Sequence, residues 1–334
     1  MTAGAATAAD AAWLAGLHDI SLSRILHVVV RLGVPDTLAN GPLSLDQLAE
    51  RCGAAPDGLA RALRPMVGLG VLALDDGGYR ITDTGRLLCR SSPENIAAEL
   101  GLQAEYLAMA EIEETVRTGR SAMTGQGGFY AVIDRDREWA ETFRDACLSR
   151  SLRTFGSLVR EHDWSGCERL VDVGGGLGHH LEAALEAVPG ARGVLLERSA
   201  AVALAEKRSW ADSVAERVDF LTADYLSGAL PKADTAMLIN ILHNLTDQES
   251  GALVARLRDS GVRRLVIGEY VLSDSPADFH PGAAADVWML VAVGGRERTR
   301  GEFTGLLADA GWSVSGIRED PRTRGSLIDC HPAA

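Results

Sequence analysis

Hydrophobic and polar positions follow different spacings in the two halves of the chain. In the first half, apolar residues recur every three or four positions and predict helices over 45–51 and 57–69. Two short apolar runs, at 71–74 and 79–81, then flank a turn of aspartates and glycines, which is typical of a β-hairpin. Two helices followed by a hairpin predict a winged-helix module, and helical spacing continues beyond it.

After residue 165 the pattern changes to short apolar runs that alternate with amphipathic segments. The runs have the length of buried strands, and the segments between them have the period of helices. This alternation predicts an α/β domain with a Rossmann-like, doubly wound parallel sheet. The predicted strands are 170–173, 193–196, 218–221, 236–239 and 265–267. We therefore expect a winged-helix-like domain at 1–91, connecting helices at 92–160 and the α/β domain at 161–334.

Composition and charge narrow the class of protein. The 334 residues are 46% hydrophobic and 24% charged, which is typical of a globular protein rather than a disordered one. A net charge of −13 opposes attraction to nucleic acid or to an anionic membrane surface. No apolar run approaches the ~20 residues that span a bilayer, and the first 16 residues lack the Lys or Arg of a secretory signal. We expect a cytoplasmic protein without a nucleic-acid or membrane partner.

The cysteines and histidines do not form a metal-binding pattern. The five cysteines are far apart, contain no C-x-x-C pair and are odd in number, so neither a zinc site nor a disulfide framework is predicted. His179 and His180 are adjacent, but no third ligand stands at a metal-binding spacing. We expect no metal site.

A glycine-rich loop follows the first predicted strand, in the segment 170–178. Glycines there allow a sharp turn and the close approach of a ligand, although His179 stands where a dinucleotide-binding fingerprint needs Gly or Ala. Glu197 ends the next strand, where a carboxylate can accept both hydroxyls of a ribose. Asp224 and Tyr225 end the third strand, where they could meet the amino group and the ring of an adenine. These residues predict a nucleotide-type ligand.

Four motifs follow one another in the order 170–178, 223–225, 241–244 and 294–299. In this order the sequence resembles the S-adenosylmethionine-dependent O-methyltransferases of the plant caffeate and bacterial natural-product type. The resemblance covers nearly the whole chain, because that family also carries an N-terminal winged-helix dimerisation domain. It implies a homodimer that uses S-adenosyl-L-methionine, releases S-adenosyl-L-homocysteine, and methylates a hydroxyl of an aromatic specialised metabolite such as a polyketide or another antibiotic precursor.

The resemblance also implies roles for residues of the cofactor site. Gly174 and Gly176 would lie against the methionine part of the cofactor. Glu197 would bind its ribose, and Asp224 with Tyr225 would border its adenine. In this reading, 161–334 binds the cofactor, 92–160 lines the acceptor pocket and 1–91 dimerises.

The catalytic candidates are His243, Glu269 and Glu297. The family histidine that matches His243 is a general base, and the matching acids flank it. A phenol has a pKa near ~10, so an adjacent imidazole that takes its proton can accelerate methyl transfer. The usual H-D-W motif is here His243-Asn244-Leu245.

Three further residues are candidates for the acceptor pocket, namely Cys147, Trp288 and Met289. Because the H-D-W motif is altered, three other functions stay open. The first is methylation of nitrogen or carbon on the same scaffold. The second is a non-methylating reaction, of the hydroxylase or decarboxylase kind, with the same cofactor. The third is a winged-helix regulator that senses a small ligand.

Overall fold

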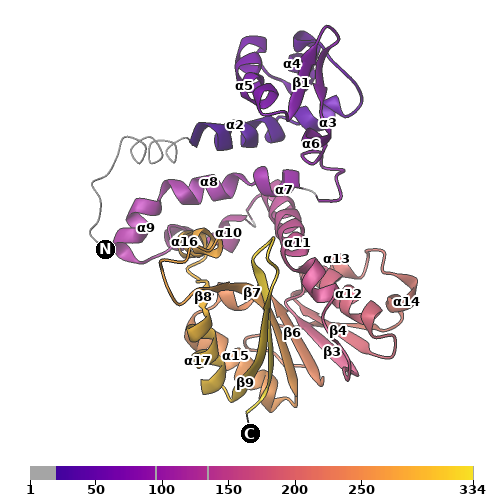
Figure 1. Ribbon diagram of the computed structural model, residues 1–334, viewed down its shortest axis with the longest axis vertical. Coiled ribbons are helices and arrows are strands. Elements are labelled where there is room, and N and C mark those ends of the chain that lie inside the picture. The colour runs from indigo at the N-terminus through magenta and orange to yellow at the C-terminus, as the bar shows by residue number, and fades with distance from the viewer. Residues whose placement is uncertain (1–19, 95, 134, 334) are drawn as a thin grey trace. The chain divides into compact units, whose positions relative to one another are not determined.

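The computed structural model describes residues 20–94, 96–133 and 135–333, and Figure 1 shows their arrangement. The chain divides into two compact units. One comprises the residues up to Gln103 together with Glu138–Ser149, and the other comprises Ala104–Arg137 together with the residues from Arg150 onward. Helix α11 (Arg137–Arg160) runs through both. The boundaries that we predict after residues 91 and 160 stay predictions.

The first unit contains the predicted pair of helices and the hairpin. Helix α4 begins with a capping box, in which Ser44 accepts from the Gln47 N–H and the Gln47 side chain accepts from the Ser44 N–H, and it ends at Gly53 in the left-handed conformation. The two predicted helices and the predicted hairpin are confirmed as α4, α5, β1 and β2. The elements of this part of the chain are α2 (Ile20–Arg31), α3 (Val34–Leu38), α4 (Leu45–Cys52), α5 (Pro56–Gly68), β1 (Leu72–Asp75), β2 (Gly78–Ile81), α6 (Asp83–Arg86) and α7 (Ile96–Leu100).

The second unit is built on one twisted sheet with the strand order β5-β4-β3-β6-β7-β10-β9. Strands β3 to β7 pair in parallel, whereas β10 is antiparallel to both of its neighbours. A short strand, β8, pairs with the end of β7. The strands are β3 (Arg169–Val173), β4 (Arg192–Glu197), β5 (Val218–Thr222), β6 (Thr235–Ile239), β7 (Arg264–Leu272), β8 (Arg298–Thr299), β9 (Trp312–Glu319) and β10 (Gly325–Pro332).

The α/β class, the mainly parallel sheet and the five predicted strands are confirmed, and the sheet also contains an antiparallel strand that the sequence analysis did not predict. Strand β10 inserts between β7 and β9, and its Ile328 lies opposite Ile267 of β7 and Ile317 of β9. Most residues of the edge strand β9 are not buried, so β9 lacks the continuous apolar run that marks the buried parallel strands in the sequence.

Helices cover both faces of the sheet (Figure 1). Neighbouring residues of β3 point to opposite faces and join two separate cores. Val171 packs in the core that contains Leu253 of α15 and Phe303 of α17. Leu170 packs in the core that contains Phe155 of α11 and Leu181 of α12. The helices of the parallel portion and the C-terminal part are α12 (His179–Ala187), α13 (Ser199–Ala205), α14 (Asp212–Ala215), η2 (Leu242–Asn244), α15 (Asp247–Asp259), α16 (Gly282–Ala292) and α17 (Arg300–Asp309).

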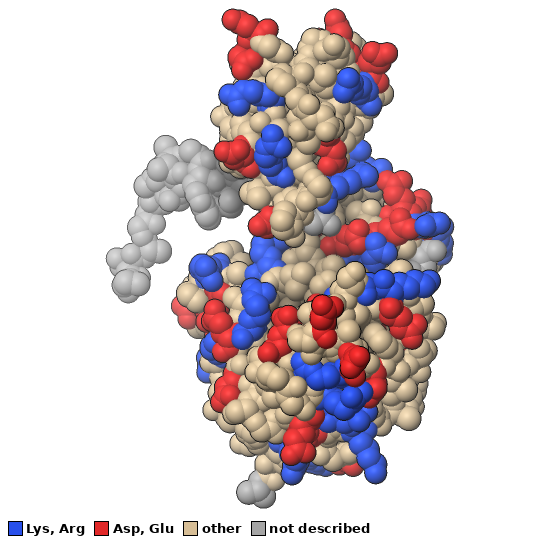
Figure 2. Space-filling model, turned by 90° about the vertical axis from the view of Figure 1, so that its right-hand side faces the viewer, with Lys and Arg blue, Asp and Glu red and all other residues tan. Residues whose placement is uncertain are grey.

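A run of short helices precedes α11 in the chain. It consists of α8 (Gln103–Ala110), α9 (Ile112–Thr118), η1 (Thr124–Gln126) and α10 (Phe129–Ile133). Across the described residues, none of the helices has the length and apolar character needed to cross a membrane. Figure 2 shows Lys and Arg interspersed with Asp and Glu over the face that it draws, without a continuous basic stripe.

Candidate active site at the carboxyl end of the sheet

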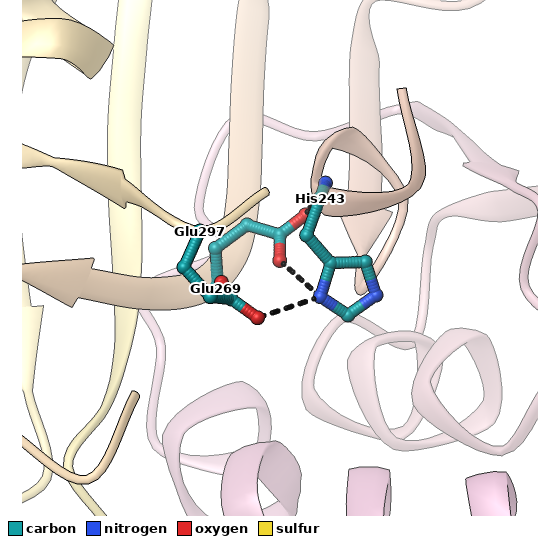
Figure 3. Close-up of side chains that lie close together, drawn as sticks. All are labelled: His243, Glu269 and Glu297. Carbon is teal, nitrogen blue, oxygen red and sulfur yellow. Dashed lines mark hydrogen bonds and ion pairs between the residues drawn. The ribbon is translucent and has the colours of Figure 1, made fainter. Parts of the chain in front are cut away.

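His243 lies in the short helix η2, which follows the carboxyl end of β6. Its ring nitrogen Nδ1 is 3.1 Å from Oε1 of Glu297 and 3.3 Å from Oε2 of Glu269, as Figure 3 shows. Glu269 is on β7, the neighbour of β6, and Glu297 directly precedes β8. The parallel pairing of β6 with β7 brings Glu269 to His243, and the pairing of β8 with β7 brings Glu297 to the same place.

The two glutamates are held in place in different ways. Oε1 of Glu269 accepts from the N–H of Ile241 at 3.0 Å and from the N–H of His243 at 3.3 Å, so this side chain binds the backbone of the turn as well as facing the imidazole. The N–H of Glu297 donates to Oδ1 of Asp286 on α16 at 2.8 Å. The side chains of both glutamates are almost completely buried. Their positions are therefore set by the sheet and by α16 rather than by solvent.

The electrostatics of this cluster follow from its burial. Burial by itself lowers the pKa of His243. The negative charges of Glu269 and Glu297 have a larger effect in the opposite direction, so the pKa is raised to about 9. The nearby Arg150 acts in the opposite sense on the same pKa. Burial raises the pKa of Glu269 to about 7. Because Nδ1 carries one proton, it can donate to one carboxylate at a time, and the hydrogen bond goes to Glu297.

The same cluster could also hold a cation. Among the described residues, His243, Glu269 and Glu297 each offer a ligand atom, and these atoms lie within 4.8 Å of one another. A metal ion would have to occupy the place of the proton that Nδ1 shares with Glu297. The expectation that the chain has no metal site stays a prediction.

The glycine loop lies close to the turn that carries His243. A Cβ on Gly174 would come within 2.5 Å of the Ile241 side chain, and one on Gly175 within 2.0 Å of Oδ2 of Asp172. Gly174 and Gly176 have φ of 68° and 59°, in the region where glycine carries no strain. A Cβ on Gly176 would meet nothing within 4 Å. The loop is thus packed on one side and open at Gly176.

Two carboxyl groups lie beneath and beside this loop. Asp172, at 1% exposed, is buried under it, and neither carboxyl oxygen has a hydrogen-bond partner among the described residues. Burial, followed by the charge of Glu197, raises the pKa of Asp172 to about 7. Burial also raises the pKa of Glu197, which accepts a short hydrogen bond from the N–H of Arg198. Buried polar groups that have no partner in the chain are suited to a ligand with donor groups.

Asp224 and Tyr225 lie at the end of β5 and face different surroundings. The carboxylate of Asp224 accepts from the Leu226 N–H and the Ser227 hydroxyl, both at 2.8 Å, and these bonds hold its pKa below the usual range. Tyr225 packs beside Gly174, where a Cβ would lie 3.4 Å from its ring. Asp224 therefore stabilises its own loop, and Tyr225 borders the glycine loop.

Family models match both parts of the chain. Residues 109–313 match the O-methyltransferase domain, and residues 16–91 match the O-methyltransferase dimerisation domain. The chain belongs to the S-adenosylmethionine-dependent O-methyltransferase family. The resemblance that we drew from the four motifs is confirmed.

Individual relatives of this methyltransferase match along nearly their whole length. The mitomycin biosynthesis 6-O-methyltransferase of Streptomyces lavendulae is 32% identical over 92% of this chain and 91% of its own. Aclacinomycin 10-hydroxylase RdmB of Streptomyces purpurascens is 30% identical over 93% of this chain and 86% of its own. The crystal structure of the O-methyltransferase NcsB1 from neocarzinostatin biosynthesis, in complex with S-adenosylmethionine and 2-hydroxy-5-methyl naphthoic acid, has a TM-score of 0.80 at 25% identity and covers 96% of this chain and 98% of its own.

The acceptor candidates of this methyltransferase belong to two helices, α16 and α11. Trp288 and Met289 are on α16, where Trp288 packs edge-on against Phe129 of α10 with ring centroids 5.6 Å apart. Met289 is buried, whereas Nε1 of Trp288 is shielded from solvent without a hydrogen-bond partner among the described residues. Cys147 is exposed on the part of α11 that belongs to the first unit. Its role in acceptor binding stays a prediction.

Several residues around the cofactor and acceptor regions were missed by sequence reasoning. Arg208 donates to the carbonyl oxygen of Leu177 at 2.7 Å and lies 3.6 Å above the ring of Trp210, and Trp210 fills the space beside Gly178. Tyr130 donates to Oδ1 of Asn244 at 3.2 Å. No local pattern distinguishes these side chains from ordinary surface residues, because their partners come from distant segments.

Proposed function

We propose that this methyltransferase transfers a methyl group to a hydroxyl of an aromatic specialised metabolite, with His243 as the general base. The observation that carries the proposal is the placement of Nδ1 of His243 against the buried carboxylates of Glu297 and Glu269. A proton held on Nδ1 leaves Nε2 as the acceptor in the neutral ring. The base therefore has a defined tautomer.

The chain's own residues have three tasks in the proposed reaction. Nε2 of His243 takes the proton of the acceptor hydroxyl as the oxygen becomes a nucleophile. The two glutamates stabilise the imidazolium that results, and the aromatic side chains near α16 exclude water and orient the ring of the acceptor. When bound, S-adenosylmethionine would supply an electrophilic methyl group on a sulfonium, with S-adenosylhomocysteine as the leaving product.

The cofactor is proposed to lie along the glycine loop. The open position at Gly176, the buried carboxyl of Asp172 and the site beside Gly174 support this assignment. Glu197 would accept from the ribose hydroxyls, while Tyr225 would cover the adenine. Asp224 keeps its proposed place beside the adenine, although its side chain already accepts two hydrogen bonds from its own loop.

A calorimetric titration with S-adenosylmethionine and S-adenosylhomocysteine tests the cofactor site. We expect Glu197→Gln to weaken both affinities by about 10- to 100-fold, since hydrogen bonds to a charged group contribute about 1.5–3 kcal/mol. Glu206→Gln, on the exposed end of the following helix, is the matched control and should bind as the wild type does. Equal affinities in the two variants would place the ribose elsewhere.

The acceptor pocket is proposed to include Trp288 and Met289 of α16. Cys147 stays a separate candidate that the family resemblance implies. Support comes from the aromatic contact between Trp288 and Phe129 and from the unpaired indole N–H. Incubation with a panel of hydroxylated aromatic acids and quinones, followed by mass detection, identifies acceptors. Substitution of Trp288 by Leu should then raise KM for the acceptor without changing cofactor affinity.

Methylation is distinguished from its rivals by the fate of a labelled methyl group. With a methyl-labelled cofactor, O-methylation puts the label on an oxygen of the product, and N- or C-methylation puts it on another atom. A hydroxylase-like reaction, which the relative RdmB makes a specific rival, leaves the product unlabelled. A ligand-sensing regulator would instead bind DNA at low salt, which a gel-shift experiment detects.

The proposed assembly is a homodimer. The match of residues 16–91 to a dimerisation domain supports it, and so does the exposure of Ile20 and Leu22 on α2 at 73% and 40%. Light scattering coupled to size-exclusion chromatography should give twice the chain mass. A monomer at micromolar concentration would contradict this assembly.

A further inference from the structure

Arg298 is an arginine inside the protein, with 1% of its surface exposed. It begins the short strand β8 and directly follows Glu297. A buried cation is costly unless its hydrogen-bond donors are satisfied. Among the described residues, the hydrogen bonds of this guanidinium go to one segment of the chain, which contains His243 and the start of α15.

The guanidinium makes four hydrogen bonds in that segment. Nη1 donates to the carbonyl oxygen of Leu242 at 2.8 Å, and Nη2 donates to the carbonyl oxygen of Leu245 at 2.9 Å. Nη2 also donates to Oγ of Ser250 at 3.2 Å, and Nε donates to Oδ1 of Asp247 at 2.9 Å. The two carbonyl groups belong to residues on either side of His243, so the planar guanidinium bridges the turn that carries the imidazole.

The backbone next to Arg298 holds the same turn from a second direction. The N–H of Arg296 donates to the carbonyl oxygen of His243 at 2.9 Å. Gly295 lies so close to this oxygen that a Cβ would come within 2.0 Å of it. The segment 295–298 therefore contacts the His243 turn through a backbone hydrogen bond, a close glycine and an arginine side chain, and it presents Glu297 to Nδ1 from the same stretch.

We propose that Arg298 is a positioning residue for the base, because it fixes the backbone on both sides of His243 and so holds Nδ1 against Glu297 with Nε2 directed to the acceptor. This inference rests on the proposed function of His243. The groups that face the imidazole are Glu269, Glu297 and Arg150, and the group that faces Arg298 is Asp247. Arg298 acts through the turn and touches none of the reacting atoms.

The test compares Arg298→Lys and Arg298→Met with the wild type. Lysine keeps the charge but cannot bridge the two carbonyl groups with a planar fork. We expect kcat to fall about 10- to 100-fold in both variants, since small misplacements of a reacting group have effects of this size. The dissociation constant of S-adenosylmethionine should stay within about twofold of the wild-type value. The pH of half-maximal kcat should move down toward that of an ordinary imidazole, because His243 moves away from its carboxylates.

Two further variants separate positioning from general stability. Arg300→Met removes an exposed arginine at the start of α17 and leaves the hydrogen bonds of Arg296 and Arg298 to the turn in place, so kcat should be unchanged. Asp247→Ala, at a carboxylate with 60% exposure, removes one of the acceptors of Arg298 and should lower kcat by only about threefold. An unchanged kcat and pH profile in Arg298→Lys would overturn the proposal, as would a fall in kcat that merely follows a loss of folded protein and of cofactor binding.

Nuclear magnetic resonance of ring-labelled histidine provides a readout without an acceptor. The pKa of His243 should fall in Arg298→Lys and stay at its wild-type value in Arg300→Met. If His243→Ala retains full kcat while this shift is seen, the proposed base has failed and the positioning of the imidazole has not. If His243→Ala is inactive and no shift is seen, the proposed role of Arg298 has failed.

Discussion

Nδ1 of His243 lies 3.1 Å from Oε1 of Glu297, with the glutamate side chain 2% exposed and the histidine side chain 18% exposed. The buried carboxylate fixes one ring nitrogen as a donor, and the partial exposure leaves the ring within reach of a ligand. Nε2 is therefore the ring nitrogen that is available to a bound acceptor.

Removal of the imidazole should abolish the base without removing the cofactor site. We expect His243→Ala to lower kcat by about 100-fold or more on an acceptor that the wild type methylates, since general-base catalysis contributes roughly that factor. The affinity for S-adenosylmethionine should remain within about twofold, because the glycine loop is formed by other residues. His331→Ala, a histidine with 52% exposure, is the control. Full kcat in His243→Ala from pH 6 to 9 would show that the base is wrongly assigned.

The Glu297 carboxylate should set the pH at which His243 works. Its charge helps to raise the pKa of His243 to about 9, so activity that needs the neutral ring increases as pH rises toward that value. In Glu297→Gln the pH of half-maximal kcat should move down by about 1 unit, and the plateau should fall because the tautomer is less firmly held. Glu161→Gln, at an exposed carboxylate, should leave the profile unchanged. A shift to higher pH would contradict this electrostatic account.

Cofactor binding should release protons from the site. A sulfonium placed for attack beside His243 adds a positive charge, and a positive charge lowers the pKa of an imidazolium. At pH 8, below the pKa of about 9, we therefore expect proton release with S-adenosylmethionine and less with the uncharged sulfur of S-adenosylhomocysteine. Calorimetry in two buffers with different ionisation enthalpies measures the difference. Equal release with both ligands, or the same release from His243→Ala, would assign the proton to another group.

Chelation of metal ions should leave methylation unchanged. We propose that Nδ1 of His243 holds a proton toward Glu297, and a metal ion would compete for that position. Treatment with EDTA followed by gel filtration should leave kcat within experimental error of the untreated enzyme. A loss of activity that one divalent metal restores would instead make the cluster a metal site.

Asp172 should destabilise the protein as pH rises. Its pKa is raised from 3.8 to about 7, so the stability contributed by its protonated form is fully present below pH 3.8 and is lost as pH rises through about 7. The loss is on the order of a few kcal/mol. Urea unfolding at pH 5 and pH 8 should therefore show a larger gain for Asp172→Asn at pH 8.

The matched control for this prediction is Asp309→Asn, which changes an exposed aspartate at the end of α17. Its free energy of unfolding should differ from the wild type by the same amount at both pH values. If Asp172→Asn behaves in the same way as this control, the buried carboxyl does not titrate in the expected range.

Much of the fold was predictable because its signals are local. The capping box at Ser44 and the apolar runs of β3 to β7 lie within short segments, so spacing alone places these helices and strands. The glycine loop is also local, since its left-handed residues, Gly174, Gly176 and Gly178, lie within five positions. The antiparallel strand β10 was not predicted, because its position between β7 and β9 depends on pairing between segments far apart in the chain.

The sequence by itself determined the elements, the glycine loop and, through the order of its motifs, the family and its candidate residues. Only the tertiary structure decided how those candidates meet: β6 and β7 bring Glu269 to His243, and burial of these charged groups shifts their pKa values. The role of Arg298 lay beyond the sequence for the same reason. Its partners are about 50 residues away, and whether an arginine is exposed or buried against two carbonyl groups depends on packing that no local pattern records.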